Sequence, residues 1–319
     1  MNAPSHVATV GPRSLPPTLV DLAEEYHTNA IRVREVIEST ANAERVYLRR
    51  FFDWFGPPDS PQVLLSRISA DSVTECLIDY ASKYGPGSRC NMQRTVRVFL
   101  RFAYLAGHLE CDLSALSPTV RVPRMGKILR GIPPASIEVV LTGIVGDTPV
   151  DLRDRAILWL LSTYGVRGVQ IRRLRLEDVD WTRSRIHFPA AKRGRSIEAP
   201  LSAKAGNRLA EYIHKGRPSS PHREVFLTTR EPFEPIPNPQ RLSELIRRRI
   251  EKAGVVLPEG VLYGAHAFRH ALASRLYGHV PFKDVIDIMG HRKPSTTLIY
   301  GKTDLVGLRK AALPWPGGA

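Results

Sequence analysis

A basic stretch rich in proline and glycine, residues 117–131, separates two parts of the chain that each show helical periodicity. It reads SPTVRVPRMGKILRG. Proline lacks a backbone N–H and glycine destabilises a helix, so a stretch of this kind is typical of an interdomain linker. The 319 residues are enough for two domains. We therefore expect a flexible tail at 1–17, one domain at 18–116 and a larger one at 132–319.

The segment before the linker is predicted to be helical, because apolar residues recur at steps of three and four. Two helices are expected within residues 19–56, and the second should bury four side chains: Val46, Tyr47, Phe51 and Phe55. A third helix is predicted from Ile68 to Tyr84, and a fourth begins at Ser88, whose hydroxyl suits an N-cap. The fourth helix should bury one apolar face: Val96, Phe99, Leu100 and Ala103.

The segment after the linker combines helices with one pair of short strands. RIHFPA and SIEAPL are the predicted strands, and they flank AKRGR, a basic turn that contains glycine. Helices are expected near 136–145, 151–164, 202–214, 241–253, 265–278 and 281–289. The predicted fold class is therefore mainly α with a small β-sheet.

The positive charge of the chain is concentrated after residue 116. Net charge is +15, and residues 1–116 hold 12 Lys and Arg against 13 Asp and Glu, whereas residues 117–319 hold 34 against 18. Arginine forks neutralise phosphates and release counterions, so the second part is predicted to bind a polyanion. No basic amphipathic helix with a strong apolar face stands out, which favours nucleic acid over a membrane.

Several other classes of protein are disfavoured. The three cysteines form no CxxC pair, which fits a reducing cytoplasm: Cys76, Cys90 and Cys111. The N-terminus lacks the apolar core of a signal peptide, and the apolar run 156–166 is too short to span a bilayer. No G-x-S-x-G elbow or P-loop occurs. His266 and His270 have zinc-site spacing, but the intervening Arg269 and the lack of a Glu disfavour a metal.

Six polar residues follow one another in a specific order: Arg167, Lys192, His266, Arg269, His291 and Tyr300. Each alone has an ordinary structural explanation, since a lone His is usually structural and a Tyr usually belongs to the core. Their surroundings read YGVRGVQIRRLRLEDVD, AKRGRSIEAP, HAFRHALASRLYGH and MGHRKPSTTLIY. With these motifs in this order, the chain resembles the tyrosine recombinases, also called the phage integrase family, over roughly residues 18–310.

The resemblance implies a helical, SAM-like core-binding domain followed by an α+β catalytic domain. It also implies that the protein cleaves and rejoins DNA through a covalent 3′-phosphotyrosyl intermediate, with Tyr300 as the nucleophile. Arg167 and Arg269 would hold the non-bridging oxygens of the scissile phosphate and stabilise the charge of the transition state. Because these cations supply the positive charge, no metal or other cofactor is expected.

The remaining site residues would handle protons and hydrogen bonds. By the same resemblance, Lys192 would protonate the leaving 5′-hydroxyl, His266 would assist proton removal from the tyrosine, and His291 would hydrogen-bond the phosphate. His270 is expected to be structural. The family commonly has a carboxylate three residues after the first arginine, whereas this chain has Gln170, which can hydrogen-bond but cannot shift a pKa by charge.

The expected partner is double-stranded DNA, clamped between the two domains, with four protomers joining two sites. The candidate phosphate contacts are three arginines on one face of the fourth helix and three linker residues: Arg94, Arg97, Arg101, Arg124, Lys127 and Arg130. By itself the helical arginine stripe would be a solvated face. Because only a short segment precedes residue 18, we expect no arm-type DNA-binding domain, and a cytoplasmic, nucleoid-associated location is expected.

Two other functions remain open at this point. A type IB topoisomerase uses similar chemistry without partner exchange, and a two-site recombination assay separates the two activities. A sequence-specific DNA-binding protein with decayed catalysis is the other alternative, and a test for a covalent adduct decides it.

Overall fold

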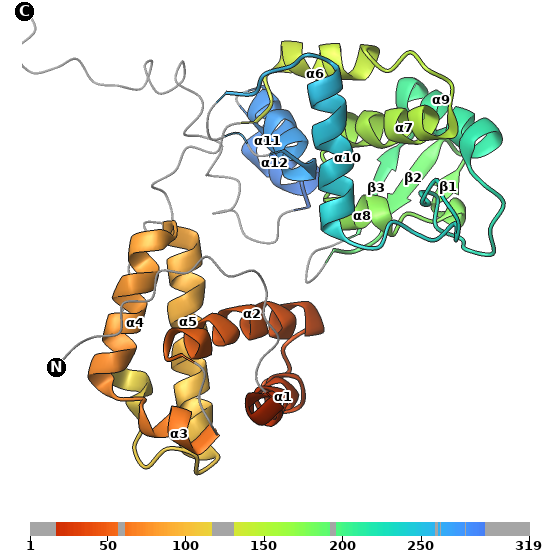
Figure 1. The fold of residues 1–319 in the computed structure, drawn as a ribbon. Coiled ribbons are helices and arrows are strands. Elements are labelled where there is room, and N and C mark those ends of the chain that lie inside the picture. The colour runs from red at the N-terminus through yellow and green to blue at the C-terminus, as the bar shows by residue number, and fades with distance from the viewer. Residues whose placement is uncertain are drawn as a thin grey trace, which may run out of the picture. The chain divides into compact units, whose positions relative to one another are not determined.

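The computed structural model describes residues 17–56, 61–116, 131–191, 196–258, 261, 263–277 and 279–290. The chain divides into two compact units, Met1–Gly126 and Lys127–Ala319 (Figure 1). Of the predicted DNA contacts, three lie outside the described residues: Arg124, Lys127 and Arg130. The described part is mostly helical with one small sheet, so the predicted fold class is confirmed.

The first unit is a set of helices. Its elements are α1 (Pro17–Arg32), α2 (Glu38–Trp54), α3 (Pro61–Ser66), α4 (Ala70–Lys83), α5 (Pro86–Leu105) and the 3-10 helix η1 (Leu113–Leu116). The side chain of Ser69 caps α4 by accepting from the backbone N–H of Ser72. The short helix α3 was not expected.

Ser88 is not the N-cap of α5, contrary to the prediction. The helix begins at Pro86, after Gly85, because a proline has the φ angle of the first helical turn and needs no N–H partner there. The Ser88 hydroxyl instead lies 2.7 Å from the hydroxyl of Tyr80 on α4, so its side chain joins two helices.

The core of the first unit is largely aromatic, and it includes Tyr26, Phe51, Phe52 and Phe99. The predicted apolar face of α5 is fully buried. The prediction for Val46 was wrong, since 52% of it is exposed. Helix α2 buries Ala41, Glu44, Leu48, Phe51 and Phe52. Val46 is two positions from both Glu44 and Leu48, and two positions on a helix correspond to a rotation of about 200°, so Val46 lies on the opposite face.

The second unit is built around helix α7. Its elements are α6 (Pro134–Thr142), α7 (Pro149–Tyr164), α8 (Gly168–Arg172), the 3-10 helix η2 (Leu176–Asp178), β1 (Val179–Asp180), β2 (Arg185–Phe188), β3 (Ile197–Pro200), α9 (Ala203–Glu211), the π-helix η3 (Tyr212–Gly216), α10 (Pro239–Lys252), α11 (Ala265–Leu276) and α12 (Phe282–Ile288). Helix α7 contacts α6, α8, α9, α10, α11 and η3. Most of its residues are therefore buried, in agreement with its apolar sequence.

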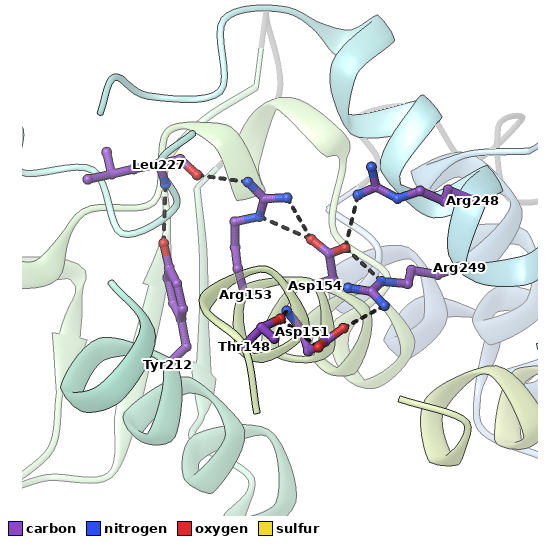
Figure 2. A network of polar contacts seen from close by, with 8 residues as sticks. All are labelled: Thr148, Asp151, Arg153, Asp154, Tyr212, Leu227, Arg248 and Arg249. Atoms are coloured by element: carbon purple, nitrogen blue, oxygen red, sulfur yellow. Dashed lines mark hydrogen bonds and ion pairs between the residues drawn. The ribbon is translucent and has the colours of Figure 1, made fainter. Parts of the chain in front are cut away.

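A buried carboxylate ties α7 to α10 and to the loop after η3 (Figure 2). Asp154 on α7 is fully buried and accepts hydrogen bonds from the neighbouring Arg153 and from Arg249 and Arg248 on α10. Arg153 also donates to the carbonyl oxygen of Leu227 at 3.1 Å. A buried charge needs such partners, and these partners lock three segments together.

The sheet has three antiparallel strands in the order β1-β2-β3. The predicted strand pair is confirmed, since β2 pairs with β3 from Arg185 opposite Pro200 to Phe188 opposite Ile197. Strand β1 was not expected, because its two residues carry too little pattern to be recognised. The turn of the β2–β3 hairpin follows the last of these pairs, so Phe188 and Ile197 mark its turn end.

No helix in the part of the chain that the structure describes is long and apolar enough to cross a membrane.

Candidate active site and nucleic-acid interface

Arg167 lies at a tight corner between α7 and α8. Helix α7 ends at Gly165, whose φ of +57° is in the left-handed region that glycine adopts without strain. A Cβ atom added there would lie 2.8 Å from Cδ2 of Leu272 on α11. Glycine therefore allows both the chain reversal and the close approach of α11, and Arg167 follows at the start of α8.

Arg269 connects this corner to the end of α12. Its side chain is buried on α11, with 2% of the residue exposed. One guanidinium nitrogen donates to the carbonyl oxygen of Gly165 at 2.8 Å, and another donates to the carbonyl oxygen of Met289. Gly165 lies two residues before Arg167, and Met289 lies two residues before His291. Three of the predicted motifs therefore meet at one guanidinium.

His266 and His270 lie one turn apart on α11, with ring centroids 6.3 Å apart. His266 is exposed, whereas His270 is partly buried. Burial lowers the pKa of His270 to about 4, and the nearby positive charges of His266 and Arg269 act in the same direction. The His270 imidazole is therefore neutral at pH 7. Among the described residues, no group of three or more His, Cys, Asp or Glu side chains is placed to hold a metal.

Gln170 is fully buried on α8 and makes two hydrogen bonds of opposite polarity. Its Oε1 accepts from the backbone N–H of Arg167 at 3.0 Å, and its Nε2 donates to the carbonyl oxygen of Pro189 at 3.0 Å. Sequence reasoning noted only that the position lacks a carboxylate. The bond to Pro189 could not be found from the sequence, because it joins residues 19 apart in different elements.

Three predicted site residues, Lys192, His291 and Tyr300, lie outside the described residues. Described residues near two of these positions in the sequence approach each other closely. A Cβ atom added at Gly290, directly before His291, would lie 3.2 Å from Cδ1 of Ile197 at the turn end of the hairpin. The start of β3, five residues after Lys192, and Gly290, directly before His291, are therefore close to each other.

The predicted arginine face of α5 is held by acidic partners in the first unit. Glu44 on α2 is 3% exposed, and it accepts from the Tyr26 hydroxyl at 2.8 Å and from Arg34 at 2.9 Å. Arg94 reaches the same carboxylate at 3.3 Å. Burial, together with the Glu44 charge, raises the pKa of Tyr26, so its hydroxyl remains a donor. Sequence reasoning missed Glu44, because nothing in its local pattern distinguishes it from a surface carboxylate.

The other two arginines of this face differ in their surroundings. Arg101 forms an ion pair with Asp112, and its guanidinium lies 5.9 Å from the ring centroid of Tyr104. Arg97 is half-buried. The three arginines therefore share a helix face, as predicted, with two of them oriented by carboxylates of the same unit.

The chain is similar in sequence to known proteins. Residues 138–305 match the model of the phage integrase family. The chain is 36% identical over 265 residues to the protein y4rA of Sinorhizobium fredii, covering 81% of this chain and 62% of y4rA. It is 30% identical over 281 residues to the tyrosine recombinase XerD of Mycobacterium tuberculosis, covering 82% and 77%. The chain thus spans less than two thirds of y4rA.

Solved structures share the fold. A XerH site-specific recombinase bound to a palindromic difH substrate aligns with a TM-score of 0.69 and 18% identity, covering 92% of this chain and 84% of that one. A lambda integrase dimer bound to a COC′ core site aligns with a TM-score of 0.66 and 17% identity, covering 88% and 94%. At these identities the likeness shows the fold alone.

Proposed function

The chain belongs to the phage integrase family, and we propose that it is a site-specific DNA recombinase or integrase that works through a covalent 3′-phosphotyrosyl intermediate. The observation that carries this proposal is the pair of hydrogen bonds from Arg269 to Gly165 and Met289. Through them the segments that precede Arg167 and His291 meet, although they are far apart in the sequence. Such convergence is what a single phosphate-binding site requires.

In the proposed mechanism, Arg167 and Arg269 bind the non-bridging oxygens of the scissile phosphate. Their positive charge stabilises the pentacoordinate transition state, in which an additional bond to phosphorus forms as the leaving group departs. Arginine cannot lose its proton at physiological pH, so this charge is permanent. The two arginines thereby take the role that a divalent cation plays in other phosphoryl transfers, and we expect cleavage without added metal or ATP.

The nucleophile is Tyr300, whose oxygen attacks phosphorus while the bond to the 5′-oxygen breaks. His266, exposed on α11, assists removal of the tyrosine proton, and His291 donates a hydrogen bond to the phosphate. Lys192 donates a proton to the departing 5′-oxygen, so the products are a phosphotyrosine and a free 5′-hydroxyl. Attack by the 5′-hydroxyl of a second strand reverses the step and completes the exchange without an outside energy source.

We further propose double-stranded DNA as the partner and a homotetramer on two synapsed sites. The division of the chain at Gly126 lies within the predicted linker 117–131, which supports a core-binding domain at 18–116 and a catalytic domain at 132–319. The concentration of positive charge after residue 116 supports a polyanionic substrate. A substrate of this kind supports our proposal of a cytoplasmic location, on the nucleoid.

A nicked suicide substrate that carries the recombination site tests the nucleophile. The wild-type protein should form a covalent adduct, visible as a mobility shift in a denaturing gel. Tyr300→Phe should bind the same DNA with unchanged affinity and form no adduct. An adduct that persists in this variant would contradict the assignment of Tyr300. A two-site assay with the wild-type protein then separates strand exchange from simple nicking and closing.

A further inference from the structure

The two hydrogen bonds of Gln170 require a donor and an acceptor in one fully buried side chain. Backbone N–H groups can only donate and carbonyl oxygens can only accept, so Arg167 and Pro189 fix which end of the amide faces which partner. An ionised carboxylate accepts at both of its oxygens. It would satisfy Arg167 but would place a negative oxygen against the Pro189 carbonyl.

These two bonds connect the start of α8 with the turn end of the β2–β3 hairpin. Pro189 directly follows β2, whose last residue, Phe188, pairs with Ile197. Lys192 lies three residues after Pro189. Gln170 therefore hydrogen-bonds the main chain at two places. One is Arg167, the proposed phosphate ligand, and the other is Pro189, three residues before Lys192, the proposed proton donor.

The opposite end of the same hairpin has a separate attachment. The hydroxyl of Tyr164 donates to the carbonyl oxygen of Pro200 at 2.9 Å and accepts from the N–H of Ser202 at 2.8 Å. Pro200 pairs with Arg185, at the end of the hairpin away from the turn. The Tyr164 ring also packs on Phe188 at the turn end, with ring centroids 5.3 Å apart, so only its hydroxyl acts separately at the other end. Tyr164→Phe keeps the ring and removes the hydroxyl bonds, and it therefore supplies a matched control.

We propose that Gln170 is a positioning residue that holds the turn end of the β2–β3 hairpin in register with Arg167, so that proton donation by Lys192 occurs at the phosphate that Arg167 binds. This inference rests on the proposed function. It gives the amide a role at a position where the resemblance to the tyrosine recombinases implied a carboxylate. The amide acts by geometry, through one accepted and one donated bond, and it carries no charge.

The test compares Gln170→Glu and Tyr164→Phe with the wild-type protein in single-turnover cleavage of two suicide substrates. One substrate has the normal 5′-bridging oxygen, and the other has a 5′-bridging sulfur, which leaves without needing a proton. We expect Gln170→Glu at pH 8 to cleave the oxygen substrate at least about tenfold more slowly than wild type. A general acid accelerates such a step by about 10²–10⁴-fold, and the variant should lose part of this acceleration. It should cleave the sulfur substrate at nearly the wild-type rate.

The pH dependence gives a second readout, which reports the protonation of the introduced carboxyl group, while the comparison of the two substrates separates positioning from a purely structural role. A protonated carboxylic acid, like an amide, offers one acceptor and one donor. The ratio of wild-type to Gln170→Glu rates on the oxygen substrate should therefore approach one as the pH is lowered and the introduced carboxyl group becomes protonated. DNA affinity should match that of wild type throughout. Tyr164→Phe should slow the two substrates equally or not at all.

Three results would overturn the inference while leaving the proposed function intact. The first is that Gln170→Glu slows cleavage of both substrates equally. The second is that this variant cleaves the oxygen substrate at the wild-type rate at pH 8. The third is that Tyr164→Phe slows cleavage of the oxygen substrate but not of the sulfur substrate. Failure of the wild-type protein to form an adduct with either substrate would instead refute the proposed function itself. The wild-type reaction therefore separates the two kinds of failure.

Discussion

The guanidinium of Arg269 donates a hydrogen bond of 2.8 Å to the carbonyl oxygen of Gly165, which lies 104 residues earlier in the chain. A second bond from the same group reaches the carbonyl oxygen of Met289. Because the side chain is buried, these bonds form in a medium of low dielectric constant, where charged donors bind strongly. Arg269 is thus a structural connection as well as a proposed phosphate ligand.

Replacing Arg269 with lysine should show the structural part of this role. A single ammonium cannot reproduce the fork that reaches two separate carbonyl groups. We expect Arg269→Lys to lower the free energy of unfolding by about 2–4 kcal/mol, on the scale of one or two lost charged hydrogen bonds. Urea denaturation measures the change. Arg275→Lys, at an exposed position on the same helix, is the control and should have little effect.

Asp154 should be among the most sensitive positions for stability. Asp154→Asn removes the negative charge that Arg153 and Arg249 share in the interior (Figure 2). Breaking a buried ion pair from one side costs about 3–5 kcal/mol, because the partner stays buried without its counter-charge. Arg153 would keep only the carbonyl oxygen of Leu227, whereas Arg249 would keep its ion pair with Asp151. Asp147 also pairs with an arginine, Arg155, but it is largely exposed. Asp147→Asn should therefore cost less than about 1 kcal/mol, and similar losses for both variants would contradict this account.

Gly165 should be required for packing as well as for its backbone conformation. Gly165→Ala places a methyl group against Leu272 and strains a left-handed residue, whereas Gly254→Ala adds a Cβ at φ +68° with nothing within 4 Å. The second variant reports the backbone strain alone, about 1–2 kcal/mol. We expect Gly165→Ala to lose more stability than Gly254→Ala in thermal unfolding. Equal losses would show that α11 moves away at no cost.

Stability should depend on pH through His270. Its pKa is about 4 in the folded protein, against about 6.5 for an unperturbed histidine, so between these values the unfolded state binds a proton that the folded state does not. The free energy of unfolding should therefore fall as the pH is lowered from 7 toward 4. His270→Gln should reduce the slope, because it removes the group whose pKa differs between the two states. Urea denaturation at several pH values would detect this, and identical slopes for wild type and His270→Gln would refute it.

Arg94 should contribute to DNA affinity without contributing to sequence choice. Its link to Glu44 holds a half-exposed guanidinium on the arginine face of α5. If that face contacts phosphates, Arg94→Ala should weaken binding equally for specific and random DNA and reduce the slope of log K against log salt by about 0.9. Arg45→Ala, which removes a pair with Glu24 on α1, should leave the slope unchanged. A loss confined to one DNA sequence would argue for base contact instead.

The amino-acid sequence by itself determined the helical class, the buried face of α5 and the β2–β3 strand pair. These features follow from local periodicity and turn composition, which each segment carries independently of its neighbours. Residue identities in their order also predicted the family, and the family model confirms it. Periodicity failed at Val46, because the row that a helix buries depends on where its neighbours lie.

Only the tertiary structure decided which partners the polar side chains have. Gln170 bonds Pro189, Arg269 bonds Gly165, and Glu44 gathers Arg34 and Arg94 across separations that no local pattern records. A sequence does not distinguish a buried carboxylate from one on the surface. It also does not distinguish an arginine that connects three segments from one that faces solvent. What distinguishes them is burial, which makes an unsatisfied polar group costly and is set by the packing of distant elements.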